Sequence, residues 1–293
     1  MKRARYKVRK FKLMQVIKLI NSGSKILKDN NILTYKLDSE ILLSKVLNKT
    51  REELLINLNQ NISSNKIRQY QKYIKRRLSK EPIAYILRKK EFWSKNFEVN
   101  KSVLIPRPET ELLVEKIVKI FKSKRISILD IGTGTGCILI SIISELDKAH
   151  GIGIDVSNKA LKVARKNLQQ FKLSHKIRLL KRSISQPLNY KFDLIVSNPP
   201  YIDSNSLRNL DDDVKKFEPK LALDGGNDGL DVIKKVIYKS KNILKDKGML
   251  ALEIGNEQYK KVSIILKKNR FRIKYLVNDY KENVRCILST LEN

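Results

Sequence analysis

Hydrophobic and polar positions follow two different rhythms along the 293-residue chain, and the first rhythm is helical. In residues 11–26, 38–47 and 64–78, apolar side chains recur at every third or fourth position, as they do on amphipathic helices. Thr50 with Glu53 three residues on adds the N-cap and carboxylate that begin another helix. We therefore predict a small all-α N-terminal domain over residues 1–80, with a basic extension at residues 1–12 and no chemistry of its own.

From residue 81 the rhythm changes to the alternation that is typical of strands. Residues 81–86 and 91–99 predict a β-hairpin linker over residues 81–104, and the prolines and threonine at residues 106–110 mark the start of a second domain. In residues 105–293, apolar strand-like runs alternate with helical segments and end in two consecutive strands. This order predicts the α/β class, with a doubly wound and mostly parallel sheet. The expected strands are residues 126–130, 150–155, 177–180, 192–197, 249–253, 271–277 and 284–291.

The expected strand at residues 192–197 ends in Asn198, Pro199, Pro200 and Tyr201. Proline has a fixed φ and disfavours helix in the residue before it, so the strand ends in a stiff, non-helical loop. In open α/β sheets, ligands bind at this carboxyl edge. The side chain of Asn198 and the carbonyl of Pro199 can each accept one hydrogen of a planar –NH2 group, and the Tyr201 ring can pack on its face. These four residues are our candidate catalytic residues.

A glycine-rich loop follows the first strand of the expected sheet, at Gly132, Thr133, Gly134, Thr135 and Gly136. Its Gly-x-Gly-x-Gly spacing differs from the dinucleotide fingerprint, Gly-x-Gly-x-x-Gly. Asp130 precedes the loop, and a negative charge there would repel a pyrophosphate but suit the ammonium and sulfonium of S-adenosyl-L-methionine. Asp155, at the end of the second strand, can accept hydrogen bonds from both ribose hydroxyls.

Composition narrows the function less than the motifs do. The chain has 62 Lys and Arg against 30 Asp and Glu, a net charge of +32, but lysine is scattered through every segment. We therefore expect a solvated basic surface with weak, salt-dependent association with RNA or ribosomes. Cys137, Cys286 and the two histidines lack metal-ligand or redox spacing, and no apolar run is long enough to span a membrane. These features predict a reducing compartment, the cytoplasm, without a metal or a membrane; we also expect a monomer, although the sequence does not give the oligomeric state.

Several motifs beyond the two loops give the chain a resemblance that extends from about residue 38 to residue 288. It resembles the class I S-adenosylmethionine-dependent methyltransferases that act on planar amino groups, and more closely the release-factor glutamine methyltransferase family (HemK/PrmC). The motifs that carry the resemblance are DSEILL at residues 38–43, EPIAYI at 81–86, EFW at 91–93, LIPRPETE at 104–111 and EPKLALDGGNDGL at 218–230.

The resemblance implies a Rossmann-like methyltransferase domain, with a seven-stranded, mostly parallel sheet and helices on both faces. It implies methylation of the side-chain N5 of the glutamine in the Gly-Gly-Gln motif of class I peptide chain release factors, with the helical domain contacting the release factor. The glycine-rich loop and Asp155 would hold the cofactor, and Asn198 would touch both cofactor and substrate. Where the family has an acid that accepts from the adenine amino group, this chain has Ser183, with Ile184 as the apolar neighbour of the adenine.

Two other interpretations remain open from the sequence. The same four-residue loop would serve a nucleic-acid amino methyltransferase acting on adenine N6 or guanine N2, which the net charge of +32 favours. No target-recognition domain is evident, however, and the motifs specific to the release-factor family are present. A non-catalytic RNA-binding or assembly protein on a methyltransferase fold is the second alternative, supported only by Ser183 in place of the acid.

Overall fold

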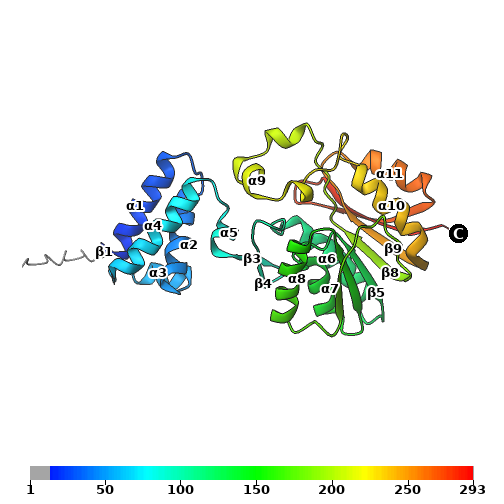
Figure 1. Ribbon diagram of the computed structural model, residues 1–293, viewed down its shortest axis with the longest axis horizontal. Coiled ribbons are helices and arrows are strands. Elements are labelled where there is room, and N and C mark those ends of the chain that lie inside the picture. Colours follow the sequence, from blue (N-terminus) through cyan, green and yellow to red (C-terminus); the bar gives the residue numbers. More distant parts are fainter. Residues whose placement is uncertain (1–13, 293) are drawn as a thin grey trace, which may run out of the picture. The chain divides into compact units, whose positions relative to one another are not determined.

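The computed structural model describes residues 14–292, which form two compact units that meet in the chain between Leu87 and Arg88 (Figure 1). The basic extension predicted at residues 1–12 lies outside the described residues. Each unit has its own hydrophobic core, because the apolar side chains buried in one cluster come from that unit alone. Each can therefore be described by itself.

The first unit is a helical bundle, as the sequence predicts. Its helices share one core, to which every helix contributes at least one buried apolar side chain. A pair of two-residue strands, β1 (Met14–Gln15) and β2 (Asn61–Ile62), is the one departure from an all-helical unit within the described residues. The helices are α1 (Val16–Asp29), α2 (Tyr35–Leu47), α3 (Arg51–Ile56), α4 (Ser64–Leu78) and α5 (Ile83–Leu87).

The predicted start of helix α3 is confirmed in detail. The hydroxyl of Thr50 accepts from the Glu53 amide at 3.2 Å, and the carboxylate of Glu53 accepts from the Thr50 amide at 2.8 Å. This reciprocal capping box satisfies two of the backbone donors that every helix leaves free at its first turn.

The hairpin predicted over residues 81–104 is shorter than expected and begins later. Residues 83–87 form helix α5, and the hairpin consists of β3 (Lys89–Phe92) and β4 (Lys95–Glu98). The prediction of a strand at residues 81–86 is therefore wrong. Pro82 is the physical reason, because its fixed φ suits the first turn of a helix, and its carbonyl accepts from the amides of Tyr85 and Ile86.

The DSEILL motif of the first unit holds two buried carboxylates, each paired with an arginine. Asp38 is 2.7 Å from Arg77 Nε and Glu40 is 2.6 Å from Arg51 Nε, and both acids are nearly inaccessible to solvent. Thr34 also donates to Asp38, at 2.8 Å. Buried carboxylates are rare unless they are paired, so these acids have a structural role in fastening α2 to its neighbours.

The second unit contains the predicted seven-stranded sheet, with strand order β10-β11-β9-β8-β5-β6-β7. The central pairs are parallel, and β11 is the one strand that runs against its neighbours β9 and β10. The sheet is therefore mostly parallel. Its strands are β5 (Ser127–Ile131), β6 (His150–Asp155), β7 (Ile177–Lys181), β8 (Phe192–Ser197), β9 (Leu244–Glu253), β10 (Phe271–Asn278) and β11 (Val284–Leu291).

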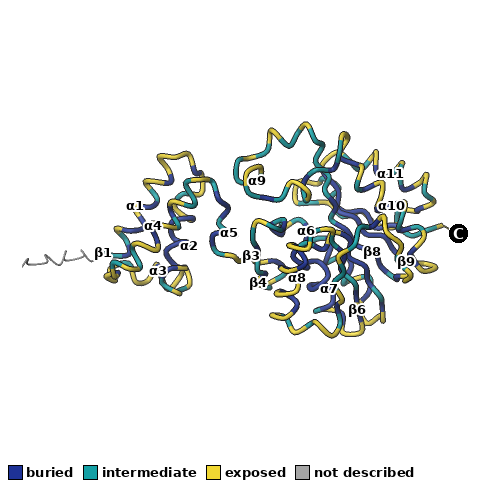
Figure 2. The backbone as a smooth tube through the Cα atoms, in the orientation of Figure 1, coloured by how far each residue is buried: buried dark blue, intermediate teal, exposed yellow. Residues whose placement is uncertain are grey.

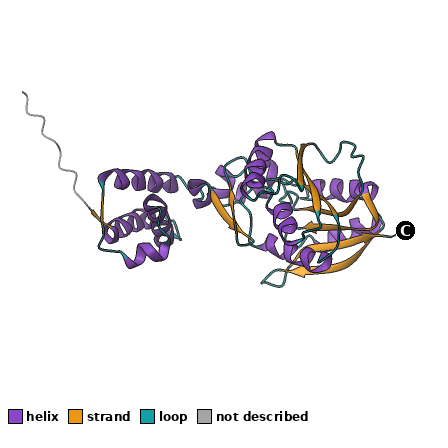
Figure 3. Ribbon diagram, turned by 90° about the horizontal axis from the view of Figure 1, so that it is seen from below, coloured by secondary structure: helices purple, strands orange, loops and turns teal. Residues whose placement is uncertain are grey.

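Helices cover both faces of this sheet, which confirms the expected layers (Figure 3). One core contains apolar side chains of α6, α7 and α8 together with Phe92 and Phe97 of the hairpin, and the other contains those of α10 and α11. Figure 2 shows the strands between these layers as the most buried part of the unit. The helices are α6 (Glu109–Phe121), α7 (Cys137–Glu145), α8 (Asn158–Gln170), α10 (Asp231–Ile243) and α11 (Tyr259–Lys268), with a short α9 (Asp212–Phe217) after β8.

Arg77→Met should destabilise the first unit by about 3–5 kcal/mol, because it leaves the Asp38 carboxylate buried without its cation. Hydrogen exchange of the α2 and α4 amides in the full chain measures the loss. The double variant Asp38→Asn with Arg77→Met should recover much of it, because no buried charge then remains. Lys75→Met, an exposed position on the same helix, is the control, and a loss as large as that of Arg77→Met would contradict the structural role of the pair.

Candidate active site

The register of three neighbouring strands brings the two candidate loops together at one edge of the sheet. Ile131, the last residue of β5, is paired with Ser197 of β8 on one side and with Ile154 of β6 on the other. The glycine-rich loop, Asp155 and Asn198 therefore leave the sheet side by side. The strand order reverses between β5 and β8, the place where open α/β sheets bind ligands.

The glycine-rich loop is built so that Gly132 and Gly134 face open space, while Gly136 and the two threonines face the protein. Gly132, Gly134 and Gly136 all have a positive φ, at 75°, 54° and 80°. A Cβ on Gly132 would meet no atom within 4 Å, and one on Gly134 would meet only the Gly132 carbonyl at 3.8 Å. Thr133 and Thr135 are buried. The loop thus presents bare backbone that a ligand can approach closely.

Asp155 is fixed in place by backbone amides. Its two oxygens accept from the amides of Gly134 at 3.0 Å and Ser157 at 2.8 Å. Burial raises the pKa of Asp155, although these amides and that of Val156 act in the opposite direction. Each carboxylate oxygen has a second lone pair, so the side chain can still accept from two hydroxyls of a ribose.

Asp130 differs from the expectation that it presents an open negative charge. Its side chain is buried, Oδ2 accepts from the Thr133 hydroxyl at 2.6 Å, and Oδ1 has no hydrogen-bond partner among residues 14–292. Burial, with the hydrogen bond from Thr133 opposing and the charge of Asp155 reinforcing it, raises the pKa of Asp130 to about 7. A cationic ligand beside this pair of acids would favour their charged forms, so the loop suits the cationic S-adenosylmethionine.

The predicted adenine contacts are partly used by the protein itself. The Ser183 hydroxyl accepts from the Ser185 amide at 3.2 Å, which leaves it one further lone pair. Ile184 is only 9% exposed and packs in the core beside α10 and α11. The contact of these two residues with an adenine ring stays a prediction.

The side chain of Asn198 is oriented by the protein. Its Nδ2 donates to the hydroxyl of Thr110, in the first turn of α6, at 3.2 Å. Within the described residues, no group donates to Asn198 Oδ1 or to the Pro199 carbonyl. The two acceptors expected from the sequence are thus both available. Pro199 is buried and Pro200 half-buried.

Tyr201 lies next to a cation. Arg285 of β11 lies over its ring, with the guanidinium carbon 5.7 Å from the centroid, and Nη2 donates to the phenol oxygen at 3.4 Å. The Tyr201 carbonyl accepts from Gln258 Nε2 at 2.9 Å. Burial and the nearby Glu253 raise the pKa of Tyr201. The ring is thus mostly buried against Arg285, and its packing on a substrate stays a prediction.

Two other motifs hold the segment around this loop. The LIPRPETE and EPKLALDGGNDGL motifs are joined through Glu218, which accepts from Arg107 Nη2 at 2.6 Å and from the Ile105 amide at 3.2 Å. Ile202, directly after Tyr201, donates to the Leu223 carbonyl at 3.1 Å and accepts from the Gly225 amide at 2.7 Å. A motif far away in sequence is therefore the backbone partner of the candidate loop.

Gly229 shows how close that packing is. Its φ is +70°, and a Cβ there would lie 2.4 Å from the Tyr201 carbonyl oxygen. The sequence marks these motifs as family features but does not reveal that they converge on residues 198–201. It also gave no reason to select Thr110, Glu253, Gln258 or Arg285, which come from separate elements; only the fold brings them together.

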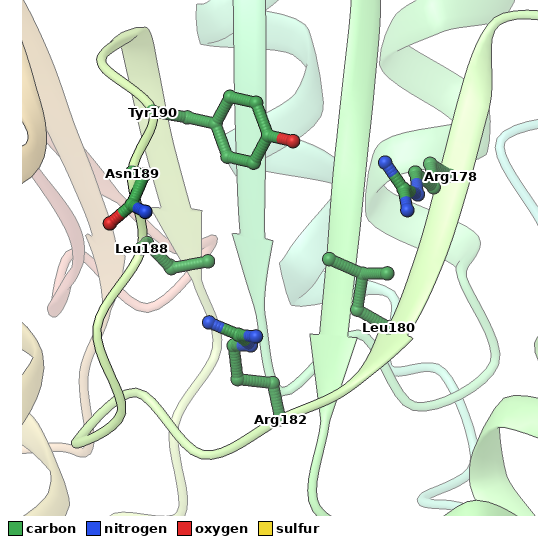
Figure 4. A pocket seen from close by; sticks show the side chains of 6 residues that line it. All are labelled: Arg178, Leu180, Arg182, Leu188, Asn189 and Tyr190. Atoms are coloured by element: carbon green, nitrogen blue, oxygen red, sulfur yellow. The ribbon is translucent and has the colours of Figure 1, made fainter.

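A separate hollow of about 230 Å³ lies at the outer strand β7 (Figure 4). Arg178, Leu180 and Arg182 line one side, and Leu188, Asn189 and Tyr190 of the following loop line the other. It includes none of the candidate catalytic residues or cofactor-binding residues. We therefore assign it no part in the site.

The described residues contain no group of three or more His, Cys, Asp or Glu side chains arranged to hold a metal ion. None of the helices in residues 14–292 is long and apolar enough to cross a membrane.

The strand order, the glycine-rich loop and the acidic residue at the end of β6 define a class I S-adenosylmethionine-dependent methyltransferase. A solved structure with the same fold is the hMettl16 catalytic domain in complex with the MAT2A 3'UTR hairpin 6, at a TM-score of 0.55 and 16% identity over 67% of this chain and 76% of that one. Two family models match, the PrmC N-terminal domain over residues 18–87 and the methyltransferase small domain over residues 108–212.

Curated relatives narrow the class. The release factor glutamine methyltransferase of Clostridium acetobutylicum is 38% identical, with 90% of this chain and 94% of the relative covered. That of Caulobacter vibrioides is 35% identical, with 94% and 96% covered. The chain belongs to the release factor glutamine methyltransferase family.

Asp155→Asn should weaken binding of S-adenosylmethionine about 10- to 100-fold, since a hydrogen bond to a charged group contributes about 1.5–3 kcal/mol. An asparagine has one oxygen, so it cannot hold both backbone amides and also accept from a ribose. Isothermal titration calorimetry measures the change. Asp147→Asn, an exposed acid in the turn after α7, is the control, and equal affinities of the two variants would remove Asp155 from the cofactor site.

Proposed function

We propose that this S-adenosylmethionine-dependent methyltransferase methylates the side-chain N5 of the glutamine in the Gly-Gly-Gln motif of class I peptide chain release factors. The observation that carries the proposal is the pair of free acceptors, Asn198 Oδ1 and the Pro199 carbonyl, on a loop beside the cofactor loop. The names of the relatives from Clostridium acetobutylicum and Caulobacter vibrioides support the same substrate.

A carboxamide nitrogen is a weak nucleophile, and hydrogen-bond acceptors on its two hydrogens would raise its reactivity. Its nitrogen lone pair is delocalised into the carbonyl, and positive charge develops on the nitrogen as it attacks. Acceptors on both of its hydrogens interact more strongly as that charge grows, so they stabilise the transition state more than the ground state. Asn198 and Pro199 are placed for this role, and Tyr201 would fix the plane of the amide.

S-adenosylmethionine supplies the methyl group on a positively charged sulfur. The residues that would hold it are the backbone of residues 132–136, Asp155 and the segment around Ser183 and Ile184, with Asn198 at the junction with the substrate. Most of the acceleration would come from positioning and from electrostatics. We assign no general base, because the methylated amide is acidic enough to lose its proton to water.

A nucleic-acid amino methyltransferase is the competing assignment, since an exocyclic amine is also a planar –NH2 group. The names of the relatives favour the release factor. We further propose that the helical first unit contacts the release factor.

Incubating the chain and S-adenosylmethionine with a purified release factor should add one methyl to the Gly-Gly-Gln peptide, as measured by mass spectrometry. Ribosomal RNA and DNA in parallel reactions should take up no labelled methyl. Labelling of nucleic acid without labelling of the release factor would overturn the proposal in favour of the alternative.

Asn198→Ala should lower kcat by about 100-fold or more, the usual effect of removing one group that stabilises developing charge. Binding of S-adenosylmethionine, measured by calorimetry, should change far less. Asn189→Ala, an exposed asparagine outside the site, is the control. Near-normal turnover of the release factor by Asn198→Ala would refute the assignment of this residue.

A further inference from the structure

Glu253 is the most unusual side chain near the candidate site. It ends strand β9, is fully buried, and neither of its carboxylate oxygens has a hydrogen-bond partner in ordinary geometry among residues 14–292. A buried carboxyl without partners costs free energy. A fold keeps such a group at a functional loop more readily than elsewhere.

The sheet register places Glu253 directly beside the candidate loop. Leu252 of β9 is paired with Ser197, the last residue of β8, so Glu253 and Asn198 are the next residues along the two chain segments. Alternation along β9 turns Glu253 to the same face as Met249 and Ala251, the face that α6 covers. There the polar groups close enough to act on its carboxyl are the hydroxyl of Thr110 and the side-chain amide of Asn198, neither of which makes a hydrogen bond of ordinary geometry with it.

The orientation of the Asn198 amide depends on which protons the Glu253 carboxyl and the Thr110 hydroxyl carry. A threonine hydroxyl has one proton and two lone pairs. When Glu253 is ionised it can only accept, so the Thr110 proton is drawn to Glu253 and the Thr110 oxygen is left as an acceptor. Only the –NH2 end of Asn198 can then bind Thr110, as observed at 3.2 Å, and Oδ1 must point away.

We propose that Glu253 and Thr110 are positioning residues that fix the orientation of the Asn198 amide, so that Oδ1 faces the –NH2 group to be methylated. The catalytic value of this orientation rests on the proposed function, whereas the orientation itself does not. Neither residue touches the reacting atoms in this account. Both act through Asn198.

The charge of Glu253 makes this orientation depend on pH. Burial raises its pKa to about 7, with Glu109 acting in the same direction and with Thr110, Arg285 and Asn198 opposing. The other titratable groups whose pKa it raises are Cys137, Tyr201 and Cys286, and burial raises the pKa of all three. A protonated Glu253 can donate to Thr110, which frees the Thr110 proton to attract Oδ1 and turns the –NH2 end of Asn198 outward. Activity should therefore increase as pH rises through about 7.

The kinetic test compares wild type with Thr110→Val, Thr110→Ser and Glu253→Gln, on a release factor, from pH 5.5 to 8.5. Thr110→Val should lose kcat by about 100-fold, the scale of a misplaced reacting group, while Thr110→Ser should keep most of it because it retains the hydroxyl. Glu253→Gln should lower kcat and remove the rise through pH 7. Glu115→Gln, also on α6, should match wild type in both respects.

Equal losses in Thr110→Val and Thr110→Ser would indicate a packing role and overturn the proposal. An unchanged pH profile in Glu253→Gln would also overturn it. A calorimetric titration with S-adenosylmethionine accompanies each variant, because a parallel loss of cofactor binding would assign the residues to that site instead.

A second measurement is independent of any substrate. The side-chain –NH2 of Asn198, labelled with nitrogen-15 and assigned by its loss in Asn198→Asp, should show an NMR shift that titrates near pH 7 in wild type and not in Glu253→Gln. If the release factor is not methylated, the proposed function fails and this measurement still decides the positioning role. If the shift of the Asn198 signal and its pH dependence are the same in Thr110→Val and Glu253→Gln as in wild type, the positioning role is overturned.

The buried acid also predicts a change in stability. A carboxyl whose pKa is raised in the folded state favours unfolding progressively as pH increases from its unfolded pKa, near 4.5, to about 7. Glu253→Gln removes this dependence. Relative to wild type, the variant should therefore have a larger free energy of unfolding at pH 8 than at pH 5, as measured by urea denaturation. A difference that is the same at both pH values would contradict the raised pKa.

Discussion

The structure depends on one rigid corner, the point where strand β8 ends and two prolines begin. Proline removes two backbone donors and fixes two φ angles, so the corner cannot relax into a helix or fold back on its own carbonyls. Two contacts with other elements then hold the corner at its ends. Thr110 holds the –NH2 end of Asn198, and Gln258 holds the Tyr201 carbonyl. The Asn198 and Pro199 oxygens remain as acceptors, and a donor from outside the chain is what they lack.

Buried acids are the second feature of this edge of the sheet. Asp130, Asp155 and Glu253 lie at the ends of three of its central strands, β5, β6 and β9, and burial raises the pKa of each. Burying an ionisable carboxyl without a cationic partner lowers the stability of a fold. This chain, with a net charge of +32, has many lysines and arginines that could have paired with these acids. Their arrangement makes sense if a cationic cofactor completes the site beside Asp130 and Asp155, and if Glu253 orients a catalytic amide.

Local signals in the sequence were sufficient for the seven strands and for the positions of the two loops. Apolar runs and alternation predicted each strand, and glycine spacing located the loop that we propose for the cofactor, because these features depend on neighbours in the chain. The interval at residues 81–86 was misread because four apolar residues in a row fit a strand or a helix, and Pro82 settled the choice in favour of a helix. The supporting residues could not be predicted. Thr110, Glu253 and Arg285 reach the site from α6, β9 and β11, so only the sheet register shows that they meet.

The central claim is that the corner grips both hydrogens of a planar carboxamide. A crystal structure of the chain with S-adenosylhomocysteine and a peptide containing Gly-Gly-Gln tests it most directly. The account predicts that the glutamine nitrogen lies within hydrogen-bond distance of both Asn198 Oδ1 and the Pro199 carbonyl. The cofactor sulfur should face the same nitrogen, so that the methyl group would lie on the line between the two atoms. A glutamine amide bound elsewhere, or Asn198 turned so that its –NH2 end faces the substrate, would contradict it.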